Sequence, residues 1–162
     1  MPDVFVPDAR FMRAAIAAAE EALSRGDGGP FGACIERDGK ILAVAHNTVL
    51  RDRDATCHAE VNAIRALSRE LQNFDLSGCT VYSTTEPCPM CFSAIHWARI
   101  GRIVFSTRIA DVQALGFNEL SVSNEQLCTL GKSPIQLVGD FLRAEGLELL
   151  KRWQASAGAR LY

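Results

Sequence analysis

The second half of the chain alternates short apolar runs with longer segments of helical periodicity. Strands are predicted over 79–84, 102–107 and 135–138, and helices over 89–99 and 140–156. Strands that are joined through helices run parallel, and helices cover such a sheet on both faces. The pattern therefore predicts an α/β fold.

The first half adds an antiparallel element. Two strands are predicted over 31–37 and 40–46, and Asp38-Gly39 between them is typical of a tight hairpin turn. This hairpin makes the sheet mixed. We therefore predict a three-layer α/β/α domain with a mixed five-stranded sheet.

Helices are also predicted around the hairpin. Apolar residues recur at helical spacing over 8–25, with Asp8 placed as the N-cap, and the glycines before Pro30 end this helix. A polar loop over 47–56 leads into a second helix over 57–71, and 111–115 is predicted as a helical turn.

Size and charge narrow the class of protein. A chain of 162 residues suggests one domain over 1–162. Seventeen Lys and Arg against nineteen Asp and Glu give no basic excess, so we expect no nucleic-acid partner. No apolar stretch reaches the roughly 18 residues of a membrane span. Six cysteines without a recognisable signal peptide favour a cytoplasmic location with free or metal-bound thiols.

Three residues have the spacing of metal ligands. Cys88 and Cys91 stand three apart where a predicted strand meets a helix, and His58 stands near the start of another helix. Thiolates are favoured at helix starts by the unpaired N–H groups there. One His and two Cys leave the fourth tetrahedral position of a zinc ion open for water, as in catalytic zinc sites. Zinc lowers the pKa of such a water toward neutrality.

Glu60 would supply a proton carrier beside that water. Residues two apart on a regular helix lie on different faces. His58 and Glu60 therefore converge only if His58 occupies the irregular first turn.

Other interpretations of the cysteine pair remain open. A C-x-x-C after a strand also occurs in dithiol redox proteins and as half of a structural zinc site. A structural site needs a fourth ligand, and the remaining cysteines have no suitable pairing; these are Cys34, Cys57, Cys79 and Cys128. Catalytic zinc is the favoured hypothesis because His58-Ala59-Glu60 accompanies the pair.

The pattern H-x-E…P-C-x-x-C is the signature of the zinc nucleobase deaminases. On these residues, and on the segments 28–33, 46–47, 86–99 and 116–117, the chain resembles the cytidine deaminase superfamily over nearly its whole length. Within that superfamily it looks most like the small bacterial guanine deaminases and related plant nucleoside deaminases. The implied fold is cytidine deaminase-like.

The resemblance implies a role for each site residue. His58, Cys88 and Cys91 would bind one Zn²⁺ per chain, and Glu60 would move the proton. The base would be contacted by the side chains of Phe31, Asn47, Trp97 and Tyr162 and by the backbone N–H of Ala59. Asp111 would read the purine and assist proton transfer. The implied assembly is a homodimer in which a swapped C-terminal segment brings Tyr162 over the site.

Plainer interpretations exist for several of these residues. Without the resemblance, core packing is the favoured interpretation of Phe31 and Trp97. Asn47 is equally consistent with a turn, and Asp111 with a helix N-cap. An apolar ridge at Phe92, Ile95, Trp97 and Ile100 is the sequence support for a dimer.

The resemblance implies hydrolytic deamination of a free purine base, guanine to xanthine and ammonia. Alternatives are guanosine, cytosine, cytidine or an aminated triazine. A tRNA adenosine deaminase shares the zinc pattern, but the charge balance argues against it.

Overall fold

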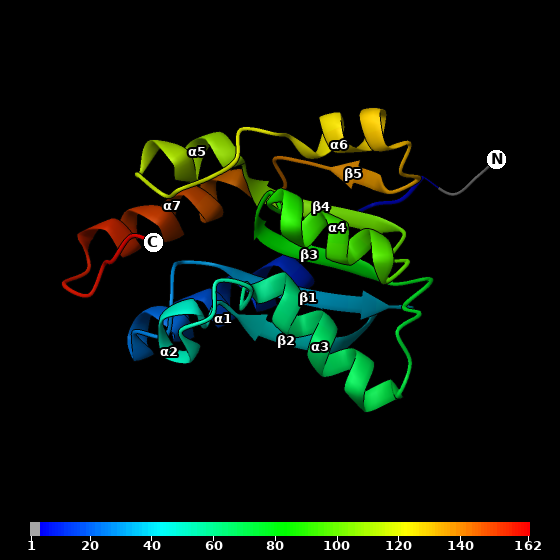
Figure 1. Cartoon of the computed structure of the whole chain (residues 1–162), viewed down its shortest axis with the longest axis horizontal. Coiled ribbons are helices and arrows are strands. Elements are labelled where there is room, and N and C mark those ends of the chain that lie inside the picture. Colours follow the sequence, from blue (N-terminus) through cyan, green and yellow to red (C-terminus); the bar gives the residue numbers. More distant parts are fainter. Residues whose placement is uncertain (1–3) are drawn as a thin grey trace.

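The sheet has five strands in the order β2-β1-β3-β4-β5 (Figure 1). β1 (Gly32–Arg37) pairs antiparallel with both β2 (Lys40–His46) and β3 (Thr80–Thr85). β4 (Arg102–Thr107) and β5 (Gln136–Val138) extend the sheet from β3 in parallel. The predicted mixed five-stranded sheet is confirmed.

Helices cover both faces of the sheet in the computed structural model, which describes residues 4–162. α1 (Ala9–Arg25) and α7 (Arg143–Ala155) lie on one face. α3 (Ala59–Leu71) and α4 (Pro89–Trp97) lie on the other, in front of the strands in Figure 1. Three shorter helices stand in the connections: α2 (Val49–Asp52), α5 (Ile109–Ala114) and α6 (Asn124–Gly131). The predicted three-layer α/β/α architecture is confirmed.

The central strands bury side chains on both faces because successive residues point to opposite sides. Val81 and Ile103 pack into the cluster under α3 and α4. Their chain neighbours Tyr82 and Val104 pack into a second cluster under α1. This double burial explains why neighbouring residues are both apolar in Val81-Tyr82 of β3 and in Ile103-Val104-Phe105 of β4.

The hairpin turn and the two ends of α1 lie where the sequence predicts them. Asp38 and Gly39 have φ values of 53° and 74°, so the hairpin turn uses two left-handed residues. The Asp8 carboxylate accepts from the N–H of Arg10 at the start of α1, and Gly26 ends that helix at φ 69°. These predictions are confirmed.

Two helices lie where no element is predicted. α2 falls in the segment expected to be a loop, and α6 falls in 118–133, which lacks a helical apolar pattern. α3 begins two residues later than predicted because His58 has extended backbone angles, φ −72° and ψ 156°, and acts as its N-cap residue.

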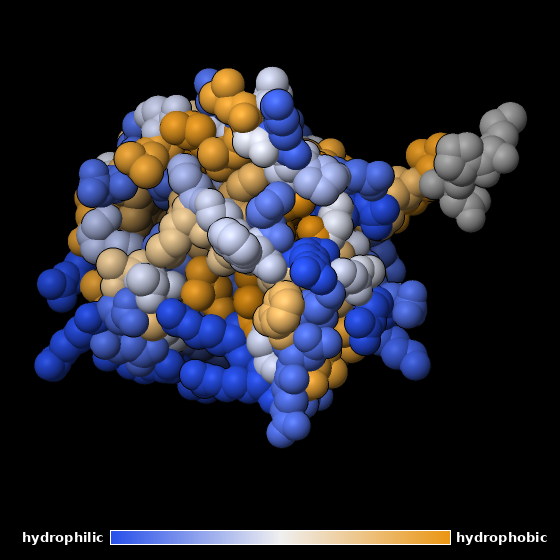
Figure 2. Space-filling view, turned by 45° about the vertical axis from the view of Figure 1, so that its right-hand side comes forward, coloured by the Kyte–Doolittle hydropathy of each residue, from blue (hydrophilic) through white to orange (hydrophobic). Residues whose placement is uncertain are grey.

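The described helices do not include one that is both long and apolar enough to cross a bilayer. On the face shown in Figure 2, hydrophobic residues occur in small groups among hydrophilic ones.

Candidate active site

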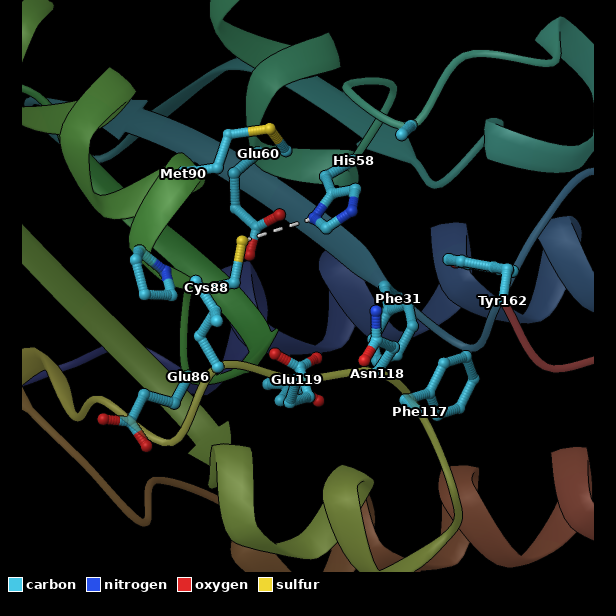
Figure 3. Close-up of a pocket in the computed structure, with 14 residues that line it drawn as sticks. Phe31, His58, Glu60, Glu86, Cys88, Met90, Phe117, Asn118, Glu119 and Tyr162 are labelled. Atoms are coloured by element: carbon cyan, nitrogen blue, oxygen red, sulfur yellow. Dashed lines mark hydrogen bonds between the residues drawn. The ribbon is translucent and has the colours of Figure 1, made fainter.

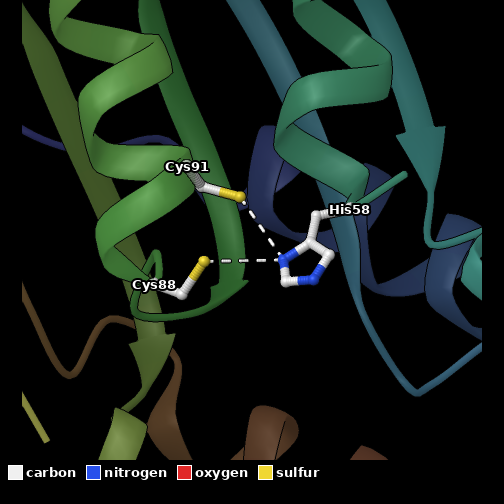
Figure 4. A group of neighbouring side chains, drawn as sticks. All are labelled: His58, Cys88 and Cys91. Atoms are coloured by element: carbon white, nitrogen blue, oxygen red, sulfur yellow. Dashed lines mark hydrogen bonds between the residues drawn. The ribbon is translucent and has the colours of Figure 1, made fainter. Parts of the chain in front are cut away.

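Three metal-binding atoms converge between the starts of α3 and α4. The Sγ atoms of Cys88 and Cys91 each lie 3.5 Å from Nδ1 of His58, and the three atoms lie within 4.8 Å of one another (Figure 4). Cys91 is buried, and the other two residues are partly buried. The structure thus brings together the three residues with ligand spacing.

The spacing of these donors fits zinc. Zinc at about 2.0 Å from nitrogen and about 2.3 Å from sulfur, at tetrahedral angles, places those atoms about 3.5 Å apart. Within residues 4–162, no fourth ligating side chain joins the group. Cys57, next to His58, instead lies 3.6 Å from a guanidinium nitrogen of Arg65. The donor set therefore has the composition of a catalytic site, with one position left for water.

Helix geometry explains the convergence. His58 and Cys88 are both N-cap residues with extended backbone angles, and Pro89 occupies the first position of α4. Each ligand thus stands where backbone N–H groups lack partners within the helix. A hydrogen bond from the Cys91 thiol, together with His58, lowers the pKa of Cys88 to about 4. A thiolate is the form in which cysteine binds a metal.

Glu60 lies in the first turn of α3, two residues after His58. It is 6% exposed, and its carboxylate faces His58 and Cys88 (Figure 3). The Ser83 hydroxyl lies 2.8 Å from Oε1 of Glu60. Burial, and then the charge of Cys88, raises the pKa of Glu60. His58 and Glu60 can converge because His58 has extended backbone angles at the N-cap and so lies outside the regular part of α3.

A cavity of about 200 Å³ opens in front of these groups, and its lining includes His58 and Glu60. Aromatic side chains form one wall. The ring centroids of Phe31 and Phe117 are 5.2 Å apart, and those of Phe117 and Tyr162 are 5.5 Å apart. The cavity therefore has an aromatic wall against which a planar ring can stack.

Tyr162 reaches this cavity from the C-terminus of its own chain. Its hydroxyl oxygen accepts a hydrogen bond of 3.1 Å from the N–H of Gly29, and burial raises its pKa. Swapping is therefore not needed to bring Tyr162 to the site, because the last residues fold back across Phe117 within one chain.

Two further predicted contact residues lie behind the cavity wall. Asn47 is fully buried, and its Oδ1 accepts from the N–H of Val49. Its Nδ2 has no hydrogen-bond partner among residues 4–162. The Asn47 side chain packs against Gly28, and the next residue, Gly29, donates its N–H to the Tyr162 hydroxyl. Ala59 is the first residue of α3 and is fully buried beside His58.

Two other predicted site residues, Asp111 and Trp97, also do not line the cavity. Asp111 caps α5 by accepting from the N–H of Arg108, and both of its oxygens accept from Arg143 at 2.8 Å. Trp97 is 79% exposed at the end of α4 and borders two other surface hollows. Asp111 is held by its helix and by Arg143, and Trp97 points outward, so substrate contact by these two residues stays a prediction.

Sequence reasoning missed Glu119 and assigned no role to Phe117. Both line the cavity from the segment between α5 and α6. Glu119 is partly buried, and burial raises its pKa to about 7. Glu119 thus lines the cavity, whereas Asp111 does not. Glu119 lies eight residues after Asp111, in a segment without helical or strand periodicity, so the sequence pattern did not indicate a role for it.

Comparisons with known proteins agree with this geometry. Residues 6–107 match the family model of the cytidine and deoxycytidylate deaminase zinc-binding region. Guanine deaminase of Bacillus subtilis (strain 168) is 40% identical over 115 residues, which cover 71% of this chain and 74% of that protein. The tRNA-specific adenosine deaminase of Buchnera aphidicola subsp. Schizaphis graminum is 31% identical over 146 residues, 90% of this chain and 93% of that protein.

A solved guanine deaminase from Nitrosomonas europaea has the same fold. It superimposes with a TM-score of 0.84 at 28% identity, over 96% of this chain and 89% of the other. The family match covers more than half of the chain and contains His58, Glu60, Cys88 and Cys91. The chain belongs to the cytidine and deoxycytidylate deaminase zinc-binding family.

Proposed function

We propose that this protein catalyses the hydrolytic deamination of guanine to xanthine and ammonia. The observation that carries the proposal is Glu60 beside the donors His58, Cys88 and Cys91, at the base of an aromatic-walled cavity. The similarity to guanine deaminases from two bacteria supports guanine as the substrate.

The ligands and Glu60 divide the chemistry between them. His58, Cys88 and Cys91 would hold a zinc ion, which when bound would lower the pKa of a water molecule beside Glu60. Glu60 accepts the proton of that water and gives it to the ring nitrogen next to the amine-bearing carbon. Glu60 then moves a second proton to the amino group, which leaves as ammonia while the oxygen of water stays on the ring.

The walls of the cavity supply recognition. Phe31 and Phe117 stack against the purine ring, and the unpartnered Nδ2 of Asn47 donates to it once the Tyr162 phenol shifts. Glu119, with a pKa near 7, exchanges a proton with the purine from the opposite loop.

A substrate panel tests this proposal. Purified zinc-loaded protein is incubated with guanine, guanosine, adenine, cytosine, cytidine and an aminated triazine, and ammonia is followed. We expect guanine to give the highest kcat/KM. A higher kcat/KM on any other compound would overturn guanine as the substrate while keeping the zinc chemistry.

A tRNA adenosine deaminase is the second candidate, because the Buchnera relative covers nearly the whole chain. Against it stand the formal charge of −2 and the Tyr162 side chain that narrows the cavity. We propose that no nucleic acid binds. Filter binding with unmodified tRNA at low salt tests this, and salt-sensitive retention with inosine formation would favour the tRNA activity.

Metal analysis separates the enzyme from a dithiol redox protein or a zinc-stabilised interaction module. We expect about one zinc per chain, with chelation abolishing turnover while the far-UV spectrum changes little. A protein that holds no zinc and cycles between dithiol and disulfide at Cys88 and Cys91 would contradict the proposal.

We also propose a homodimer. The predicted apolar ridge is wrong for most of its members, because Phe92, Ile95 and Ile100 are buried in the protein's own core. Trp97 remains, 79% exposed, with Phe74, 64% exposed, bordering the same hollow. Light scattering tests the assembly: twice the chain mass is expected, and Trp97→Glu should yield monomers.

We place the protein in the cytoplasm and treat 1–162 as one deaminase domain. All six cysteines are free thiols in the structure, which suits a reducing compartment. Fractionation of cells that express the protein tests the location, and recovery outside the cytoplasmic fraction would contradict it.

A further inference from the structure

A buried side-chain pair ties the first helix to the end of the hairpin. The Oδ2 atom of Asp27 lies 2.8 Å from Nε2 of His46, and their side chains are 8% and 13% exposed. Asp27 directly follows the left-handed cap of α1, and His46 is the last residue of β2. Neither residue lines the cavity in front of Glu60.

The residues that follow this pair in the sequence lie behind Tyr162, which lines the cavity. Gly28 follows Asp27, and Asn47 follows His46. Gly28 packs directly against Asn47, because a Cβ added to Gly28 would stand 2.1 Å from Oδ1 and 2.7 Å from the carbonyl oxygen of Asn47. The next residue, Gly29, donates its N–H to the Tyr162 hydroxyl. Asp27 is therefore connected to Asn47 through Gly28 and to Tyr162 through Gly29.

A second set of contacts connects His46 and Thr48, the two neighbours of Asn47, to the start of α3, the helix that carries Glu60. The side-chain amide of Asn62, on α3, lies 3.0 Å from the carbonyl oxygen of His46 and 3.3 Å from that of Cys57. The backbone N–H of Thr48 donates to the Cys57 carbonyl. His46 is thus held from one side by Asp27 and from the other by α3.

We propose that Asp27 and His46 are a positioning pair, which sets the distance between the Asn47 amide and Glu60 without touching the substrate. The pair acts through the backbone of Gly28 and Asn47. This inference rests on the proposed role of Asn47 in binding the base.

The test replaces His46 in two ways. His46→Leu removes the hydrogen bond while keeping most of the volume, and His46→Gln keeps an N–H donor for Asp27. Losing a buried hydrogen bond to a carboxylate predicts that His46→Leu raises KM about tenfold, with kcat changed less than about threefold. His46→Gln should restore KM to within about threefold of the parent. Arg13→Leu, which breaks an exposed ion pair with Glu145, is the matched control.

A second readout does not depend on turnover. The Asn47 N–H donates to the Phe31 carbonyl at 3.0 Å, and the pair holds this bond in place. Hydrogen exchange should accelerate at Asn47 and Gly29 in His46→Leu, while the β3 amides stay protected.

Two results would overturn the inference. One is an unchanged KM with unchanged exchange at Asn47. The other is a fall in kcat that parallels lost zinc or lost β3 protection, which indicates general destabilisation. If His46→Leu folds poorly, Asp27→Asn provides the same comparison. Faster exchange at Asn47 in His46→Leu, together with a wild-type KM in Asn47→Ala, would support the positioning pair. It would contradict the proposed role of Asn47 in binding the base.

Discussion

The hydroxyl of Ser83 lies 2.8 Å from Oε1 of Glu60 and 2.6 Å from the carbonyl oxygen of Thr85. A hydroxyl has one hydrogen and two lone pairs. When Glu60 is ionised, Ser83 donates to it. When Glu60 carries a proton, it donates to Ser83, whose own hydrogen turns to Thr85. Both protonation states of the proposed proton carrier therefore keep a partner.

Ser83→Ala should lower kcat about tenfold, because one state of Glu60 loses a hydrogen bond worth roughly 1.5 kcal/mol in a buried site. Steady-state kinetics on guanine measures this. Ser106→Ala is the matched control, since Ser106 is a buried strand serine that bonds only the Leu142 carbonyl. Equal losses in the two variants would show that Ser83 matters only for packing.

Glu119→Gln should lower kcat/KM at least about tenfold, because an amide cannot exchange a proton with the base. Asp111→Asn should leave kcat/KM within about threefold, since Asp111 bonds Arg143 and Arg108 instead of lining the cavity. The two variants compare the observed carboxyl with the one predicted from sequence. A larger loss of kcat/KM in Asp111→Asn than in Glu119→Gln would indicate that Asp111, and not Glu119, acts on the substrate.

Arg143 lowers the pKa of Asp111 below its ordinary value of 3.8. A carboxylate with a lowered folded-state pKa contributes its full stability above the unfolded value, and the contribution disappears as pH falls through the folded value. Arg143→Gln should therefore reduce the free energy of unfolding by about 1 kcal/mol near pH 7. That difference should shrink below pH 3.8. Urea titrations over this range measure it, and a difference that grows on acidification would contradict the assignment.

Tyr162→Ala removes an aromatic wall of the cavity and the acceptor for the Gly29 N–H. KM for guanine should rise about tenfold, while Tyr162→Phe, which keeps the contact with Phe117, should give a smaller rise. Mixing Tyr162→Ala with Glu60→Gln protein tests swapping. Activity that returns on mixing would show that a partner supplies Tyr162 and would contradict closure within one chain.

Elements with buried apolar faces were predictable from the sequence. β3 and β4 bury both faces, so neighbouring apolar residues indicated these strands. The turn between β1 and β2 needs two left-handed residues, so Asp38-Gly39 indicated its position. α6 was not predictable, because only Asn124 of its eight residues is buried. Its N-cap Ser123 and a hydrogen bond from the Asn124 N–H to Glu86 hold it in place instead.

The ligands were predictable because zinc requires fixed residue types at short spacings. The rest of the cavity wall was predictable only in part, because it joins segments distant in sequence. The family resemblance pointed to Phe31 and Tyr162, which line the cavity, but Glu119 comes from a loop without periodicity. Trp97 lies on α4, which is apolar around most of its circumference, so its outward direction could not be predicted from spacing.

The most direct measurement compares zinc content and turnover in Glu60→Gln. The substitution keeps the shape of the side chain and leaves His58, Cys88 and Cys91 intact. We predict about one zinc per chain and a kcat on guanine that falls at least about 100-fold. Near wild-type turnover by the zinc-loaded variant would contradict the assignment of Glu60 as the proton carrier.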